Sequence, residues 1–313
     1  MKNYLAPMEG VTNWVYRNAY HDCFYPMDKY FTPFITAKPN KRLSSKEIKE
    51  VSPETNGDLP VIPQILTNNA EDFVKTAHIF RDEYGHREVN LNLGCPSGTV
   101  TAKGKGAGFL GEPDKLERFL DEIFAKCNIQ ISVKTRLGME DASGFPELMK
   151  LYNKFPMKEL IIHPRVQKDF YKNTPNLEMF AEAFAMSTNP VCYNGDIFCV
   201  EDHQRICERF PELDAVMSGR GTLTNPALAR EIRGGQALTK AELRKFHDLV
   251  YHTYRAEVSG DRNVLFKMKE LWFYMGPLFA NNKKYLKKIK KSEKCIVYES
   301  AVAELFSNEE LIL

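Results

Sequence analysis

A cysteine stands at the end of an apolar, strand-like stretch, in the segment LNLGCPSGTVTAKGKGAG at residues 91–108. Pro96 follows it, and glycines then alternate with other residues. A thiol has an ordinary pKa of about 8.5, so Cys95 is mostly protonated at neutral pH and can donate a proton or act as a nucleophile. Many cysteines are only small buried hydrophobes. The position at a strand terminus favours chemistry at Cys95 over cysteines in helix-like stretches, namely Cys23, Cys127 and Cys207.

The glycines at 106, 108 and 111 spell G-x-G-x-x-G, the pattern of a dinucleotide-binding turn. That turn requires its glycines directly after a strand and at the opening of a helix. Here SGTVTAKGK separates Gly106 from the strand-like stretch. The sequence therefore disfavours dinucleotide binding and predicts a flexible glycine-rich segment beside the thiol.

Other strand-like stretches also end in polar residues. Lys134 lies inside the apolar run ISVKT, where a lysine needs an anionic partner or a shifted pKa. His163 ends LIIH and is open to two interpretations, a packed or a functional histidine. The tripeptides NGD at 194–196 and GRG at 219–221 offer small residues and a guanidinium, and together they indicate a phosphate site.

Short β-branched stretches alternate with amphipathic ones over the first 236 residues. Eight such units match the size of a (β/α)8 barrel, an α/β fold whose active sites lie at the carboxyl ends of its strands. A doubly wound open sheet is the alternative. Helical spacing is clearest at 70–84, 113–127 and 177–187. The expected strands are at residues 3–7, 29–34, 60–66, 88–95, 130–138, 159–165, 190–196 and 214–220.

The last part of the chain reads as helices only, which predicts a smaller all-helical C-terminal domain. GGQ at 234–236 is a plausible hinge. We therefore divide the chain into a barrel at 1–236 and a helical domain at 237–313. The expected helices cover 239–258, 263–276, 282–292 and 294–306.

Composition narrows the class of protein. No apolar run can span a bilayer, and Pro7 and Glu9 interrupt the N-terminus where a signal peptide needs an apolar stretch, so we expect a cytoplasmic protein. Seven scattered cysteines without a C-x-x-C pair suggest neither disulfides nor a metal site. The net charge is +2, yet residues 281–294 hold seven lysines and one glutamate, which indicates a polyanionic partner.

The ordered motifs resemble those of the tRNA-dihydrouridine synthases, including the shorter bacterial members. The similarity covers nearly the whole chain, from LAPMEGVT at 5–12 and the Cys95 segment to DAVMSGRG at 214–221. SVKTRLG, IIHPR and YNGDI follow between them in the order of the family. One departure is HPRV at 163–166, where the family commonly has histidine-glycine-arginine-threonine, and Pro164 removes a backbone N–H there.

The resemblance implies an FMN-dependent enzyme that reduces uridines of tRNA with NADPH. Hydride would pass from flavin N5 to uracil C6, and Cys95 would protonate C5. Asn92 and Arg165 would lie near the uracil, which must leave its stack to react. The implied flavin contacts are Pro7, Met8, Gln64, Lys134 and His163, with Asn194, Gly195, Asp196, Gly219 and Arg220 around the phosphate.

The resemblance also implies that the helical domain binds tRNA, and we expect a monomer. The lysines expected to contact tRNA phosphates are Lys284, Lys287, Lys288 and Lys291. Two alternatives stay open: an FMN-barrel reductase of a small molecule, such as a dihydroorotate- or enoate-type enzyme, and a non-catalytic RNA-binding relict.

Overall fold

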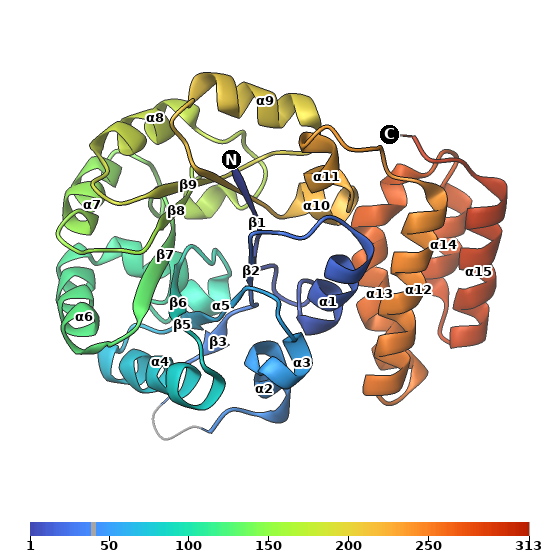
Figure 1. The fold of residues 1–313 in the computed structure, drawn as a ribbon, viewed down its shortest axis with the longest axis horizontal. Coiled ribbons are helices and arrows are strands. Elements are labelled where there is room, and N and C mark those ends of the chain that lie inside the picture. Colours follow the sequence, from blue (N-terminus) through green and yellow to red (C-terminus); the bar gives the residue numbers. More distant parts are fainter. Residues whose placement is uncertain (39–41, 313) are drawn as a thin grey trace. The chain divides into compact units, whose positions relative to one another are not determined.

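The computed structural model describes residues 1–38 and 42–312, and its sheet is entirely parallel. Figure 1 shows the strands as a ring with helices α4, α6, α7 and α8 outside it. The sheet order is β3-β5-β6-β7-β8-β9-β10-β1-β2-β4. The strands are β1 (Lys2–Leu5), β2 (Lys29–Phe31), β3 (Ile35–Thr36), β4 (Val61–Ile62), β5 (Gln64–Leu66), β6 (Glu88–Leu93), β7 (Gln130–Arg136), β8 (Leu160–His163), β9 (Val191–Asn194) and β10 (Ala215–Ser218).

These ten strands amount to eight barrel positions because two stretches are each broken in the middle. β2 and β3 are successive pieces of one stretch interrupted around Pro33, and β4 and β5 are pieces of another interrupted at Pro63. β2 pairs with β4 and β3 pairs with β5, so the two stretches run side by side and close the ring. Proline has no N–H to give to a ladder, which explains both interruptions. The predicted (β/α)8 barrel is confirmed.

The barrel interior is apolar in the middle and ionic near the amino ends of the strands. Its central cluster is Tyr4, Ala6, Phe31, Ile161, Cys192, Ala215 and Met217. Below it, Lys29 Nζ lies 2.9 Å from Glu88 Oε2 and 3.5 Å from Glu159 Oε2. The Tyr4 hydroxyl donates to Glu159 Oε1 at 2.9 Å. The Lys29 ammonium thus forms ion pairs with two buried carboxylates.

The three helices expected between the strands, at 70–84, 113–127 and 177–187, form as α4, α6 and α8 to within one residue at either end. They begin and end at recognisable signals: the Asn69 side chain accepts from the Asp72 amide at the start of α4, and Gly85 ends that helix at φ 73°. Those of the barrel are α2 (Ser45–Val51), α3 (Pro53–Asn56), α4 (Ala70–Tyr84), α5 (Gly98–Thr101), η1 (Gly106–Gly111), α6 (Pro113–Lys126), α7 (Phe145–Tyr152), η2 (Gln167–Asp169), α8 (Leu177–Met186) and α9 (Val200–Arg209).

The chain separates into two compact units. The first holds residues 1–7, 28–196 and 207–218, and with them the whole sheet; the second holds 8–27, 197–206 and 219–313. The second unit is helical, as predicted for the C-terminal part, and the boundary at residue 236 stays a prediction. Its helices include α1 (Trp14–Cys23), α10 (Arg220–Thr224), α11 (Leu228–Ile232), α12 (Lys240–Glu257), α13 (Asp261–Met275), η3 (Gly276–Leu278), α14 (Lys283–Lys291) and α15 (Cys295–Asn308).

The second unit is built on aromatic contacts and one buried polar cluster. Phe246 of α12 lies 5.4 Å from the ring of Tyr16 in α1. The Tyr298 hydroxyl lies 2.6 Å from His247 Nε2 and accepts from Trp272 Nε1 at 2.7 Å. None of the helices in the described part of the chain combines the length and the apolarity that a bilayer crossing requires.

Candidate active site

The Cys95 backbone is held in place by a neighbouring asparagine. The Asn92 side chain accepts from the Gly94 amide at 3.1 Å and from the Cys95 amide at 2.9 Å. The Cys95 carbonyl accepts from the Ala107 amide at 3.1 Å. The Asn92 side-chain oxygen therefore fixes the turn that carries the thiol. The expected place of Asn92 near the uracil stays a prediction.

Asn92 is one end of a buried chain of amides across three strands. It donates to Gln64 Oε1 at 2.7 Å, and Gln64 Nε2 donates to Asn90 Oδ1 at 2.8 Å. Asn90 in turn donates to the Ser132 hydroxyl at 3.0 Å. Satisfied polar chains in an apolar interior are stiff because each broken bond leaves an unpaired group. Gln64, a predicted flavin contact, is thus held rigidly at the mouth of the barrel.

The glycine-rich segment after Cys95 is folded into α5 and η1 rather than left as the expected flexible loop. Gly106 has φ 56°, and a Cβ there would lie 2.9 Å from the Cys95 carbonyl oxygen. A Cβ at Gly108 would lie 2.6 Å from the Thr101 carbonyl oxygen. Gly106 and Gly108 thus allow the backbone to fold closely against Cys95 and Thr101.

Arg136 is a residue of the site to which the sequence assigns no role. It donates to the Gly94 carbonyl at 2.9 Å, and to the Val166 and Phe170 carbonyls at 3.0 Å each. Its guanidinium lies 5.6 Å from the centre of the Tyr171 ring. Arg136 therefore ties the Cys95 turn to the loop after β8. Its spacing of two from Lys134 on β7 places both on one face of the strand, a signal that could have identified it.

Lys134 lies on β7 next to this group. Burial, and secondarily the positive charge of Arg136, lowers the pKa of the Lys134 ammonium to about 7, although Cys192 and Cys95 act in the opposite direction. The Lys134 ammonium therefore loses its proton far more readily than that of an exposed lysine. Of the two expectations for Lys134, an anionic partner or a shifted pKa, this environment supplies the shifted pKa.

Replacement of Lys134 by methionine should stabilise the flavin-free protein at low pH. Below pH 7 Lys134 is charged in both the folded and the unfolded chain. Between pH 7 and about 10.5 it is charged mainly in the unfolded chain, which therefore binds more protons. The free energy of unfolding of the wild type thus rises with pH in that range. We expect Lys134→Met to raise the free energy of unfolding by about 1–3 kcal/mol at pH 6 and by less at pH 9. Urea unfolding at both pH values measures this. Lys150→Met, on the exposed side of α7, is the control, and an equal shift at both pH values would contradict the assignment.

Buried His163 and Arg165 and half-buried Asp196 are linked at the ends of β8 and β9. Arg165 pairs with both Asp196 oxygens, at 3.0 and 2.6 Å. It also lies 3.1 Å from His163 Nε2 and donates to the Asn173 carbonyl at 2.6 Å. The Arg165 amide donates to the His163 carbonyl at 2.7 Å around Pro164. All three guanidinium nitrogens of Arg165 thus have partners within the protein, and its expected place near the uracil stays a prediction.

The ends of β9 and β10 form a small, polar cradle in the first unit. The Asn194 side chain donates to the Met217 carbonyl at 2.8 Å. A Cβ at Gly195 would overlap the Tyr193 hydroxyl. Among the described residues, the buried Ser218 hydroxyl has no hydrogen-bond partner. An unpartnered hydroxyl beside an obligatory glycine fits a bound anionic oxygen.

The remaining predicted cofactor residues follow the ends of β1 and β10. Pro7 follows β1, and Met8 opens a turn in the second unit, where its amide donates to the Thr12 hydroxyl at 2.8 Å. Lys267 of α13 donates to Gly10 in the same turn at 3.1 Å. Gly219 and Arg220 begin α10, and the Arg220 guanidinium lies 5.4 Å from the centre of the Phe198 ring. No group of three or more metal-ligating side chains occurs in residues 1–38 and 42–312.

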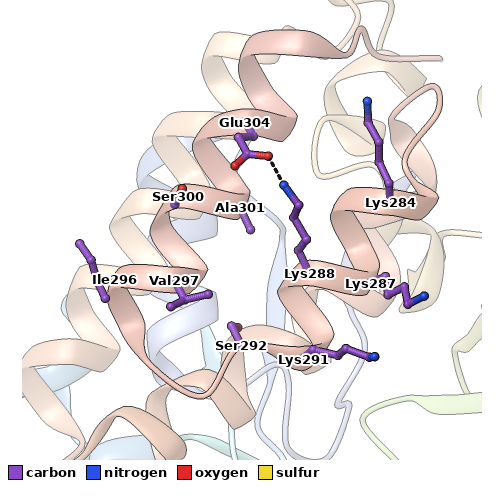
Figure 2. Close-up of a pocket in the computed structure, with 10 residues that line it drawn as sticks. All are labelled: Lys284, Lys287, Lys288, Lys291, Ser292, Ile296, Val297, Ser300, Ala301 and Glu304. Atoms are coloured by element: carbon purple, nitrogen blue, oxygen red, sulfur yellow. Dashed lines mark hydrogen bonds and ion pairs between the residues drawn. The ribbon is translucent and has the colours of Figure 1, made fainter.

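The four lysines predicted to contact tRNA all lie on α14 of the second unit. They are exposed, and the helix is anchored by buried Tyr285 and Ile289, as its sequence pattern indicates. Lys288 forms an ion pair with Glu304 of α15 at 2.5 Å (Figure 2).

A model of the dihydrouridine synthase family, described as "Dihydrouridine synthase (Dus)", matches residues 4–308. The chain belongs to the dihydrouridine synthase family. The prediction of this family, and with it the prediction of an enzyme, is confirmed.

Curated relatives agree with the family match. The chain is 29% identical over 229 residues to a probable tRNA-dihydrouridine synthase 1 of Synechocystis, a match that covers 72% of this chain and 63% of that protein. It is 28% identical to a tRNA-dihydrouridine(16) synthase of Cupriavidus necator, covering 74% and 73%. It is 27% identical to a probable tRNA-dihydrouridine synthase 2 of Bacillus subtilis, covering 81% and 79%.

Solved structures at low identity share the fold alone. An old yellow enzyme homologue from Zymomonas mobilis superposes with a TM-score of 0.55 at 12% identity, covering 78% of this chain and 92% of that one. A morphinone reductase mutant superposes with a TM-score of 0.54 at 11% identity, covering 78% and 90%. This member of the dihydrouridine synthase family thus shares its barrel fold with these two proteins.

Proposed function

We propose that this protein reduces uridines in tRNA to 5,6-dihydrouridine, with bound FMN and with NADPH as the reductant. The observation that carries the proposal is the construction around Cys95: an asparagine, a carbonyl contact and a tightly packed glycine segment all fix one thiol at the mouth of a (β/α)8 barrel. The printed names of the relatives, tRNA-dihydrouridine synthases, supply the substrate class.

The residues at the barrel mouth fit a flavin. The unpartnered Ser218 hydroxyl and the small residues Asn194 and Gly195 suit its phosphate. A lysine with a lowered pKa suits the polar edge of its ring system. When bound, FMN would supply the hydride. We assign its contacts to Pro7, Met8, Gln64, Lys134 and His163, with Asn194, Gly195, Asp196, Gly219 and Arg220 at the phosphate.

We assign the proton to Cys95 and the positioning to its neighbours. The Cys95 thiol donates its proton to uracil C5 and is reprotonated from water, so the residue acts as a general acid. Asn92 holds the Cys95 amide, and Arg136 holds the Gly94 carbonyl one residue earlier. Exposed Tyr171 lies 6.0 Å from the His163 ring and beside Arg136, where an aromatic face can border the uracil. We also assign Asn92 and Arg165 to the surroundings of the uracil, where Arg165 is held by Asp196.

Loss of Arg220 should weaken flavin binding. We expect the purified protein to be yellow, and Arg220→Ala to reduce its affinity for FMN by about 10- to 100-fold, the effect of one charge-assisted phosphate contact of about 1.5–3 kcal/mol. Titration of the flavin-free protein, followed by flavin fluorescence, measures this. Arg118→Ala, on the exposed side of α6, is the control. A colourless wild type that FMN cannot reconstitute would contradict the proposed function itself.

A further inference from the structure

The turn that carries Cys95 continues into Pro96, whose carbonyl accepts from the side-chain amide of Gln167 at 2.7 Å. Proline has no N–H, so this carbonyl is its one backbone polar group. Gln167 belongs to the segment at residues 166–173 that follows β8 and contains η2, which we call the β8 loop. A long, half-buried side chain thus joins the β8 loop to the residue directly after the thiol.

The β8 loop is held by several hydrogen bonds of its own. The Val166 amide donates to Asp169 Oδ2 at 3.0 Å, and the Asn173 side chain donates to Asp169 Oδ1 at 2.5 Å. The Gln167 amide donates to the Gly138 carbonyl at 2.9 Å, which fixes the loop to the chain that follows β7. The side chain of Gln167 therefore extends from a backbone whose place is defined.

Phe170 shows how firmly the β8 loop is held. Its φ is 49° and its ψ is −94°, a conformation that residues with a Cβ rarely adopt. Such strain persists only where the surrounding contacts impose it. Here the Phe170 amide donates to the Gln167 carbonyl at 3.1 Å, and the Phe170 carbonyl accepts from Arg136 at 3.0 Å. The same guanidinium donates to Gly94, so the strained turn and the Cys95 turn have a common anchor.

We infer that Gln167 is a positioning residue for Cys95, because its bond to Pro96 sets where the thiol lies when the uracil enters the site. The inference rests on the proposed function, which supplies the substrate. The Cys95 amide donates to Asn92, and the Cys95 carbonyl accepts from Ala107. The bond to Pro96 fixes the peptide unit that follows. An acid must lie within hydrogen-bond reach of the atom that it protonates, and a displacement of about 1 Å can lower a rate about 100-fold.

Two matched variants, Gln167→Met and Asn68→Leu, test the position at which the segment is held. Each replaces a side-chain amide by an apolar group of similar size. Asn68 donates to the Lys103 and Gly104 carbonyls at 2.9 and 3.3 Å, so it holds the same glycine-rich segment farther along the chain from the thiol.

We expect Gln167→Met to lower the single-turnover rate of uridine reduction about 10- to 100-fold. The affinity for tRNA and the reduction of the flavin by NADPH should not change, since neither needs the thiol. Asn68→Leu should change the rate by less than about 2-fold, because its contacts lie away from the reacting atoms. Equal rates in the two variants would overturn the inference. So would a loss in Gln167→Met that appears only as weaker tRNA binding, which would make Gln167 a substrate contact.

Gln167→Glu separates the hydrogen bond from the packing of the side chain. Glutamate has the length and shape of glutamine, but its ionised carboxylate cannot donate to the Pro96 carbonyl, whereas its protonated form can. We expect Gln167→Glu to be about 10- to 100-fold slower than the wild type at pH 8, and to recover several-fold relative to the wild type as the pH falls to 5. Gln167→Met should show no such recovery. A Gln167→Glu rate that stays a constant fraction of the wild-type rate would contradict the inference.

A measurement without tRNA distinguishes failure of this inference from failure of the proposed function. Deuterium exchange, read by mass spectrometry of peptides, follows the Gly94, Cys95 and Ala107 amides, which form hydrogen bonds within the turn. We expect exchange in these peptides to be about 5- to 20-fold faster in Gln167→Met and unchanged in Asn68→Leu. If the wild type forms no dihydrouridine, the proposed function fails, and faster exchange still supports the hold of Gln167 on the Cys95 turn. If the wild type forms dihydrouridine, and Gln167→Met changes neither rate nor exchange, the inference is overturned and the function stands.

Discussion

Cys95→Ala should abolish most uridine reduction while leaving flavin and tRNA bound. Removal of a general acid typically lowers a rate by about 10²–10⁴-fold. Oxidation of NADPH by the flavin should continue, because that half-reaction takes no proton from the thiol. The measurement is single-turnover formation of dihydrouridine from tRNA and pre-reduced enzyme.

The control is Cys127→Ala, which removes another half-buried thiol far along the chain from the active-site segment. Burial raises the pKa of the Cys127 thiol to about 11, so it is an inert hydrophobe at neutral pH. Its rate should equal that of the wild type. A Cys95→Ala enzyme that reduces tRNA at the wild-type rate would show that another group delivers the proton.

Lys29→Met should cause the largest loss of stability, about 3–5 kcal/mol at pH 8, because it leaves two buried carboxylates without their cation. The side chains of Lys29, Glu88 and Glu159 are only 17%, 7% and 9% exposed. Burial already raises the pKa of the Glu159 carboxyl in the wild type, although Lys29 opposes it. Removal of Lys29 raises that pKa further. Urea unfolding at several pH values measures the effect.

The sign of the pH dependence distinguishes lost ion pairing from lost packing. The pKa of the Glu159 carboxyl is higher in the folded chain than in the unfolded chain. Between these two pKa values the folded chain binds more protons, so the free energy of unfolding falls as the pH rises. The Lys29→Met penalty should therefore be smaller at pH 5 than at pH 8. Glu88→Gln and Glu159→Gln, added together to Lys29→Met, should recover much of the loss. A penalty independent of pH and unaffected by these changes would contradict the ionic account.

The sequence predicts the barrel well because periodicity and burial determine its elements locally. The expected helices at 70–84, 113–127 and 177–187 are α4, α6 and α8 to within one residue at either end. It misses the division of two strands at Pro33 and Pro63, although the missing proline N–H that interrupts each strand is a local feature of the sequence. It also misses that residues 8–27 belong to the helical unit, because packing such as Phe246 on Tyr16 depends on tertiary contacts.

Within the site, residue type and strand position predict which side chains belong to the site better than they predict which hydrogen bonds those side chains form. Lys134 was singled out correctly as a lysine with an unusual environment, because its apolar neighbours are adjacent in sequence. The sequence does not show that Asn92 also bonds to the Cys95 amide, or that Arg165 also bonds to Asp196 and lies against His163. Which partner a long polar side chain reaches depends on neighbouring strands that are remote in sequence.

The central claim is tested most directly by incubating the purified protein, with FMN and NADPH, with an unmodified tRNA transcript and digesting the product for nucleoside mass spectrometry. The account predicts that dihydrouridine forms at a defined position with the wild type and falls by at least about 100-fold with Cys95→Ala. A flavin-loaded wild type that oxidises NADPH and binds tRNA yet forms no dihydrouridine in any tRNA would contradict it.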